Sequence, residues 1–201
     1  GMYVYQVLTP IQVGPMQLKN RVMYLAMAKY LSTPDNFVTD RQIAYYENYA
    51  KGGVGLITTG ACICFPDCPS KLQMQPGLYD DKFLPGLTKL VDAVHSHGAK
   101  FLFKPWHPGI SAYGCDAAEL KSVADLTLGE IHAMQRQYLE CAVRAQKAGA
   151  DGVEFHMAHN YLPEEFLTPL FNKRTDEYGA QTMESGLRFS TECIKMIKET
   201  C

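Results

Sequence analysis

The sequence lacks the marks of several protein classes. Its 201 residues carry a formal net charge of only −2, whereas nucleic-acid-binding proteins usually show a clustered basic excess. No apolar run approaches the roughly 20 residues that a membrane helix needs. The N-terminus has no basic stretch followed by a long apolar segment, as a signal peptide would. We therefore predict a cytoplasmic protein that binds neither nucleic acid nor membrane.

The cysteines are too few and too irregular for a disulfide framework. There are seven, an odd number, and without a secretory signal they are expected to be reduced thiols. Cys62, Cys64 and Cys68 suggest a metal site, but no second ligand pair follows at zinc-ribbon spacing. Pro66 and Pro69 indicate an ordinary loop around them. We therefore predict no metal site.

The composition that remains is typical of one globular domain. Hydrophobic residues make up 47% and charged residues 20% of the chain, both ordinary values. No linker or low-complexity tract divides residues 1–201, which correspond to one to one-and-a-half average domains. The leading Gly1-Met2 pair is typical of a cleaved tag, so Gly1 is interpreted as a tag remnant.

Helices and strands alternate along the predicted fold. Three junctions repeat a pattern in which a helical stretch ends at glycine and a short apolar run follows, at 51–57, 97–103 and 148–155. Helical periodicity marks stretches that begin near Thr39 and Phe83, and the ranges 127–148 and about 184–199. Strands are expected near 22–28, 54–60, 100–105 and 152–156.

This alternation predicts an α/β fold with a parallel sheet and right-handed crossovers. About four βα units fit half of a (β/α)8 barrel of the TIM type. A flavodoxin-like open sheet has a similar number of strands and is the alternative.

Candidate functional residues follow the last predicted strand. In a barrel, functional groups gather at the carboxyl ends of the strands. His156 and His159, three residues apart, can point into one pocket and bind a carbonyl oxygen on which negative charge develops. Tyr161 beside them can donate a proton. A chance pairing or a metal-dependent hydrolase remains open, although acidic ligands at suitable spacing are lacking.

Three strings in the chain resemble one enzyme family. They are 10–22 (PIQVGPMQLKNRV), 150–162 (ADGVEFHMAHNYL) and 166–179 (FLTPLFNKRTDEYG). They are similar to the Old Yellow Enzyme family of FMN-dependent NAD(P)H oxidoreductases, which includes the 2,4-dienoyl-CoA reductase branch. The resemblance implies that hydride passes from NADH or NADPH to the flavin N5 and then to the β-carbon of an enone or enoyl substrate.

The resemblance also implies roles for particular positions. His156 and His159 would clamp the substrate carbonyl, with Tyr161 as the candidate proton donor. The remaining positions would lie along the flavin ring (Ala26, Met27, Ala28), face the substrate (Tyr30), approach the flavin by backbone (Ala61), or bond its pyrimidine edge (Lys104).

The chain also departs from the family pattern. Ala28 replaces a cysteine or threonine, Lys104 replaces a glutamine, and Ile110 replaces an arginine. Gly186 stands early in a predicted helix, where glycine costs up to about 1 kcal/mol. No glycine-rich phosphate loop is found in the four units.

These departures support an alternative function. The chain would then be a truncated, non-catalytic half-barrel that does not bind FMN alone. It would cover its exposed strand edges by forming a homodimer or by pairing with another chain.

Overall fold

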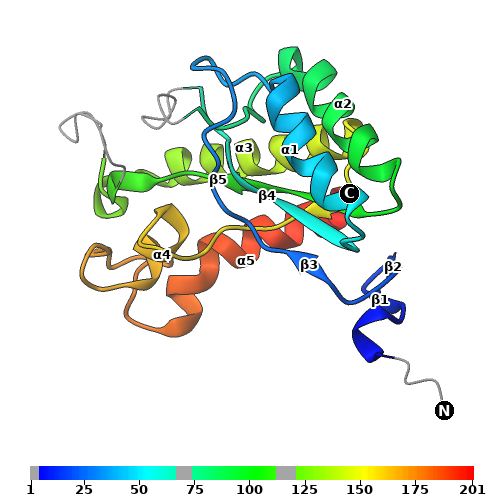
Figure 1. Ribbon diagram of the computed structural model, residues 1–201. Coiled ribbons are helices and arrows are strands. Elements are labelled where there is room, and N and C mark those ends of the chain that lie inside the picture. Colours follow the sequence, from blue (N-terminus) through cyan, green and yellow to red (C-terminus); the bar gives the residue numbers. More distant parts are fainter. Residues whose placement is uncertain (1–4, 67–73, 112–120) are drawn as a thin grey trace.

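The computed structural model describes residues 5–66, 74–111 and 121–201. Gly1, Met2, Asp67, Cys68, Pro69 and Cys115 lie outside these ranges. The chain begins with a 3-10 turn, Gln6–Leu8, and an antiparallel hairpin of β1 (Ile11–Val13) and β2 (Met16–Leu18). The hairpin was not predicted from the sequence, and it lies to one side of the main sheet (Figure 1).

A parallel sheet of four strands forms the centre of the molecule. Its strands are β3 (Met23–Tyr24), β4 (Leu56–Ile63), β5 (Lys100–Trp106) and β6 (Gly152–Val153), and they are neighbours in chain order. A flavodoxin-like sheet places its second strand outside the first, so that alternative is wrong. Consecutive order is the order of a (β/α)8 barrel, and the sheet is part of one.

The two edge strands are shorter than the sequence predicts. β3 covers two residues of the predicted 22–28, and β6 covers two of the predicted 152–156. Both segments contain the predicted apolar run. Within the described chain, each strand has ladder hydrogen bonds to one neighbour only.

Four long helices form where the periodicity predicts them. They are α1 (Asp40–Lys51), α2 (Leu84–His95), α3 (Leu128–Lys147) and α5 (Met183–Thr200). Threonine hydroxyls cap three of them, and Thr127 Oγ1 accepts from the Glu130 N–H at 3.1 Å. A short helix, α4 (Leu162–Leu167), and 3-10 turns at Asp81–Phe83, Gly109–Ser111 and Val123–Asp125 were not predicted.

Gly186, which has a low helix propensity, packs at the contact between α5 and α4. A Cβ at this position would lie 3.4 Å from the Leu167 Cα and the Phe166 carbonyl oxygen. The glycine therefore lets α5 approach the backbone of α4 closely. Phe166 and Phe189 stack beside this contact with ring centroids 4.6 Å apart.

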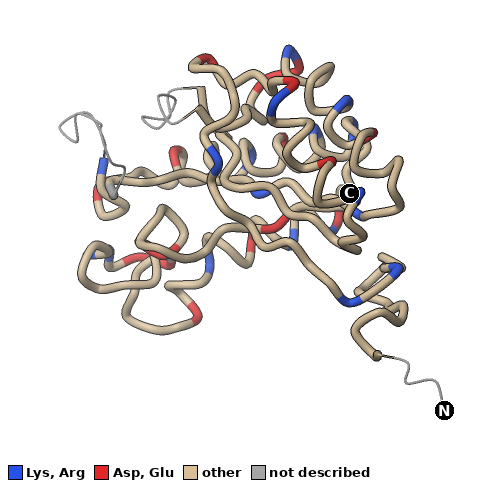
Figure 2. Tube along the Cα trace, viewed as in Figure 1, with Lys and Arg blue, Asp and Glu red and all other residues tan. Residues whose placement is uncertain are grey.

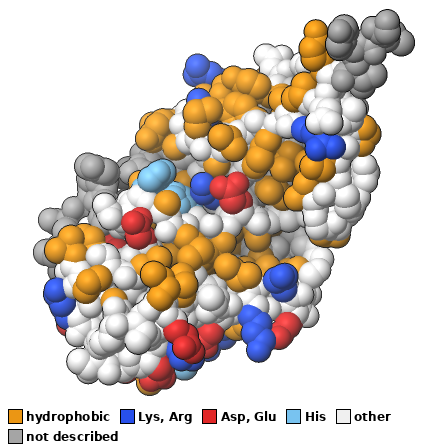
Figure 3. Space-filling model, turned by 90° about the horizontal axis from the view of Figure 1, so that it is seen from below, with side chains coloured by type: hydrophobic (Ala, Val, Ile, Leu, Met, Phe, Trp, Pro, Cys, Tyr) orange, Lys and Arg blue, Asp and Glu red, His pale blue; other side chains and the backbone are white. Residues whose placement is uncertain are grey.

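The two faces of the sheet have different surroundings. Along β5, Phe101 and Phe103 are fully buried in the core, whereas Leu102 and Lys104, which alternate with them, are only partly buried. At the β3 edge, Met23 is 40% exposed and Leu25, just after the strand, is 64% exposed. Seen from below, the molecule shows broad hydrophobic areas between scattered charges (Figure 3).

The charges of the described chain are mixed in sign. Lysines and arginines are intermixed with acidic residues along the tube (Figure 2). Among the described residues, no helix is both long and apolar enough to cross a membrane.

Candidate functional site

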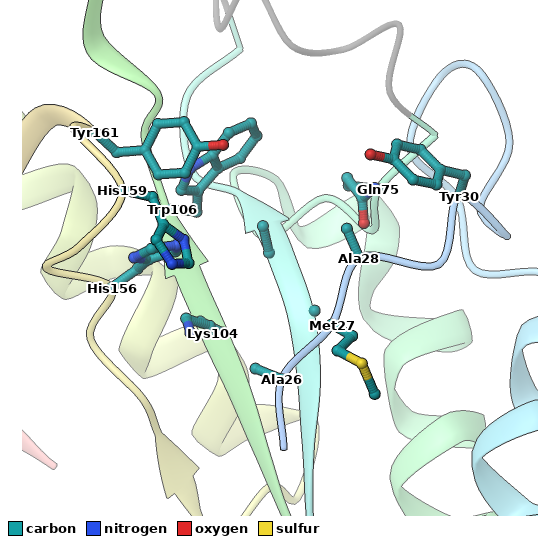
Figure 4. A pocket seen from close by; sticks show the side chains of 12 residues that line it. Ala26, Met27, Ala28, Tyr30, Gln75, Lys104, Trp106, His156, His159 and Tyr161 are labelled. Atoms are coloured by element: carbon teal, nitrogen blue, oxygen red, sulfur yellow. The ribbon is translucent and has the colours of Figure 1, made fainter. Parts of the chain in front are cut away.

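The carboxyl ends of the four parallel strands and the loops after them surround one cavity of about 530 Å³ (Figure 4). Its lining contains every site residue predicted from the sequence, together with Gly60, Gln75 and Trp106. The complete lining is Ala26, Met27, Ala28, Tyr30, Gly60, Ala61, Gln75, Lys104, Trp106, His156, His159 and Tyr161.

One wall of the cavity is made of small side chains. Ala26 and Ala28 follow β3, and Gly60 and Ala61 lie in β4 beside them. A Cβ on Gly60 would lie 2.4 Å from the Met27 carbonyl oxygen, so only glycine lets the two segments approach this closely. Ala26, Ala28, Gly60 and Ala61 thus present no side-chain atom beyond Cβ to the cavity.

A β-bulge places Gly60 and Ala61 at this wall. Thr58 pairs with Leu102 and Ala61 pairs with Lys104, so two residues of β4 oppose one residue of β5. Bulges redirect side chains and are frequent beside functional sites. The Gly60 N–H, which lies within the bulge, donates to the Tyr46 hydroxyl at 3.2 Å.

Three aromatic rings form the opposite wall. The His156 ring lies 5.4 Å from His159 and 5.2 Å from Tyr161, measured between ring centroids, with planes near perpendicular. Figure 4 shows the two imidazoles and the phenol on the same side of the cavity. The three side chains predicted to work together therefore lie together.

The protonation state of His156 follows from its surroundings. Burial, then the positive charges of Lys104 and His159, lower the pKa of His156 to about 4. The imidazole is thus neutral at pH 7. Its Nδ1 accepts from the Ala158 N–H at 3.3 Å, which assigns the proton to Nε2 and makes that nitrogen the available donor.

The loop between β6 and α4 holds these rings in place. His159 and Asn160 adopt φ angles of 63° and 61°, a left-handed conformation that costs about 1–2 kcal/mol per residue. The Asn160 N–H donates to Glu164 Oε2 at 2.7 Å, and the Leu162 N–H donates to the His107 carbonyl at 3.1 Å. Both bonds tie the loop to neighbouring structure.

Trp106 is both a core residue and part of the cavity lining. It is 2% exposed, and its ring stands edge-on to Tyr161 at 5.1 Å. Its backbone N–H donates to the Cys64 Sγ at 3.1 Å.

Lys104 is the charged residue of the lining. Its Nζ lies 3.0 Å from Glu154 Oε1, and its backbone N–H donates to the Thr59 hydroxyl at 3.2 Å. The lysine side chain is 16% exposed and the glutamate side chain 34% exposed.

The rim opposite the histidines contains Tyr30 and Gln75 (Figure 4). Tyr30 is 58% exposed and has a left-handed backbone with φ 54°. Gln75 is buried, and its carbonyl accepts from Asn36 Nδ2 at 2.9 Å. Sequence reasoning missed Gln75 because its position depends on such long-range contacts and no local motif marks it. Ile110, one of the departures, does not line the cavity.

The lining fits the ring system of a flavin better than its phosphate. The small-residue wall can take a planar ring, while Lys104, Gln75 and the histidines provide polar partners for its edges. A phosphate is usually held by backbone N–H groups or several cations, and the lining contains one lysine and no arginine. Within the described ranges, no three His, Cys, Asp or Glu side chains gather as a metal site.

Comparison with known proteins identifies the family. The sequence profile of the NADH:flavin oxidoreductase / NADH oxidase family matches residues 6–201. The chain belongs to this family. The resemblance to Old Yellow Enzymes is thereby confirmed, and flavin and NADH, which the family's description names, agree with the FMN and NAD(P)H that the resemblance implies.

Individual relatives agree in sequence and in fold. An NADH oxidase of Thermoanaerobacter brockii is 35% identical over 203 residues, covering 94% of this chain and 31% of that protein. Old Yellow Enzyme from Pichia sp. AKU4542 superposes with a TM-score of 0.87 at 29% identity, covering 96% of this chain and 56% of that one. A 2-naphthoyl-CoA reductase in complex with 2-naphthoyl-CoA gives a TM-score of 0.87 at 27% identity, covering 96% of this chain and 33% of that one. This member of the family thus spans about a third of the curated relative and matches part of the barrel in each structure.

Proposed function

We propose that this chain provides the flavin-ring and substrate pocket of an FMN-dependent NAD(P)H oxidoreductase that reduces activated alkenes. The observation that carries the proposal is the convergence of the small-residue wall and the His156, His159 and Tyr161 rings on one cavity. Bound FMN would accept hydride from NADH or NADPH and supply it to the β-carbon of an enone or enoyl thioester.

The histidines would polarise the substrate. His156, neutral with its proton on Nε2, donates a hydrogen bond to the substrate carbonyl oxygen, and His159 lies close enough to share that oxygen. Both donors stabilise the negative charge that develops on this oxygen as hydride arrives at the β-carbon. A neutral donor suits this task because its hydrogen bond persists across the whole neutral pH range.

Tyr161 would complete the reduction. Its ring stands within 5.2 Å of His156 and 6.3 Å of His159, measured between centroids. The phenol can therefore deliver the proton that the α-carbon needs after hydride addition. Trp106 packs against the same ring and keeps it facing the cavity.

The small-residue wall supports a ring stacked opposite these donors. Ala26, Ala28 and Gly60 present no atoms beyond Cβ, so a planar ring can lie flat against them. The neighbouring fold of a 2-naphthoyl-CoA reductase with its thioester bound supports enoyl or aroyl thioesters as a substrate class.

The test is alkene reduction by the chain loaded with FMN, using NADH and a cyclic enone. His156→Ala removes a main donor to the carbonyl, so kcat/KM should fall by about 10²–10³, as for other oxyanion donors. His132→Ala is the matched control, because His132 lies on α3 and does not line the cavity. Equal activity of the His156 variant and the wild type would contradict the proposal.

A second function rests on the open sheet. β3 and β6 have free edges within the described chain, and Met23 and Leu25 are exposed beside β3. Two copies related by a two-fold axis can pair β6 of each with β3 of the other, which closes eight strands. In this alternative the chain is a self-associating half-barrel without catalytic activity.

Sedimentation of the chain with and without FMN distinguishes the two functions. A dimer that binds no FMN favours the second, and a dimer or monomer that binds FMN favours the first. Leu25→Glu should dissociate the dimer, whereas Leu170→Glu should not, because Leu170 is 72% exposed on the loop after α4. A wild-type chain that sediments as a monomer overturns the self-association.

A further inference from the structure

One residue of the cavity lining belongs to a charged pair whose other member lies outside the lining. Lys104 and Glu154 are 3.0 Å apart. Lys104 belongs to the cavity lining, whereas Glu154 does not. A ligand in the cavity would therefore contact Lys104 and not Glu154, the carboxylate that balances its charge. In Figure 4, Lys104 lies between His156 and Ala26 along the cavity.

The charge of Lys104 acts on a ring of the cavity wall, that of His156. Lys104 is the second-largest cause of the lowered pKa of His156, after burial. The pair is thus neutral as a whole, but its cationic member is the one that lines the cavity.

A positive field distinguishes the two redox states of a flavin. The oxidised ring is neutral, and two electrons with one proton convert it to a reduced ring that is an anion. A fixed cation nearby stabilises the anion and leaves the neutral form almost unchanged. A glutamine side chain has no charge and gives no such preference.

We propose that Lys104 makes this pocket bind reduced FMN more tightly than oxidised FMN, and that Glu154 limits this preference. The inference rests on the proposed function, because it requires FMN in the cavity. It assigns Lys104 a role as a residue that sets the potential of the cofactor, in addition to any hydrogen bond it makes.

The test measures the dissociation constants of oxidised FMN and of FMN reduced anaerobically with dithionite, for the chain and its variants. Lys104→Gln should lower the preference for reduced FMN about tenfold, which lowers the two-electron midpoint potential by about 30 mV. Lys104→Arg should keep the wild-type preference, since the charge remains. Glu154→Gln should increase the preference, since the opposing carboxylate is removed.

Lys100→Gln is the matched control. Lys100 lies on the same strand and pairs with Asp151 at 3.7 Å, as Lys104 pairs with Glu154. It is four residues away, about 13 Å along an extended strand, beyond the screening length of about 8 Å at physiological salt. Its loss should leave the preference unchanged.

The outcomes separate this inference from the function on which it rests. If both forms bind and Lys104→Gln weakens them equally, the lysine is only a structural partner of Glu154 and the inference is overturned. If the wild-type chain binds neither form, the proposed function fails and this inference fails with it.

Discussion

At the scale of single residues, the state of His156 decides what the cavity can do. Its ring is buried and accepts from the Ala158 N–H through Nδ1. These two contacts fix a neutral ring with Nε2 as donor, which is the form that can bind a carbonyl oxygen. A sequence containing His-x-x-His does not specify this tautomer, because the Ala158 contact depends on how the loop after β6 folds.

We expect the His156 ring to remain neutral from pH 7.5 to 5.5, with its titration midpoint near 4. The physical cause is burial, reinforced by the charges of Lys104 and His159. Two-dimensional ¹⁵N NMR that resolves imidazole nitrogens measures this directly, with His156→Ala providing the assignment. A midpoint near 6.5, or a proton on Nδ1, would contradict the assignment.

At the scale of elements, the bulge in β4 and the segment after β3 form the wall on which a ring can lie. The wall depends on Gly60, whose absent side chain lets the Met27 backbone pass directly over it. The sequence Thr59-Gly60-Ala61 indicates a strand end, but it does not show which other segment of backbone will pack against Gly60.

Gly60→Ala should destabilise the chain by about 1–3 kcal/mol, the usual cost of overpacking, and should weaken binding in the cavity. Urea denaturation measures the first effect. Gly129→Ala in α3 is the control, because a Cβ there meets nothing closer than 3.8 Å. That variant should be neutral or up to about 1 kcal/mol more stable. The account of the wall would be refuted if Gly60→Ala were as stable as Gly129→Ala.

The sequence predicted interior elements better than edge elements. β5 and the four long helices bury a periodic apolar face, and that periodicity is visible in the residues. β4 is buried along nearly its whole length, and a short apolar run after a helix-ending glycine marks it. β3 and β6 have the same apolar runs, but their ladders depend on neighbours that the run does not specify. The strand end placed His156 at the cavity and the family resemblance placed Lys104 there. Gln75 is positioned by long-range contacts, such as the bond from Asn36 Nδ2 to its carbonyl, which no local motif marks.

At the scale of the whole molecule, two buried histidines tie stability to pH. Burial lowers the pKa of His107 to about 4, and burial with nearby charge does the same for His156. In the unfolded chain both imidazoles titrate near 6.5. Between these values the unfolded chain binds more protons, so the free energy of unfolding falls as pH drops from about 6.5 to about 4.

His107 alone should cost about 2 kcal/mol of stability between pH 7 and pH 5. In His107→Asn, the new Oδ1 can accept from the Gly109 N–H in place of Nδ1, which now does so at 2.9 Å, and no titratable group remains. Urea midpoints of the two chains at pH 7 and pH 5 give the comparison. Parallel losses in both chains would show that His107 does not cause the pH dependence.

The most direct test of the central claim is the visible absorption spectrum of the chain after incubation with excess FMN and desalting. We expect retained flavin bands, because the cavity brings a flat wall, a cation and carbonyl-binding donors together. The Gly129→Ala chain should retain flavin equally, and the Gly60→Ala chain should retain less. A wild-type chain that emerges without flavin would contradict the account and leave the self-associating half-barrel as the better description.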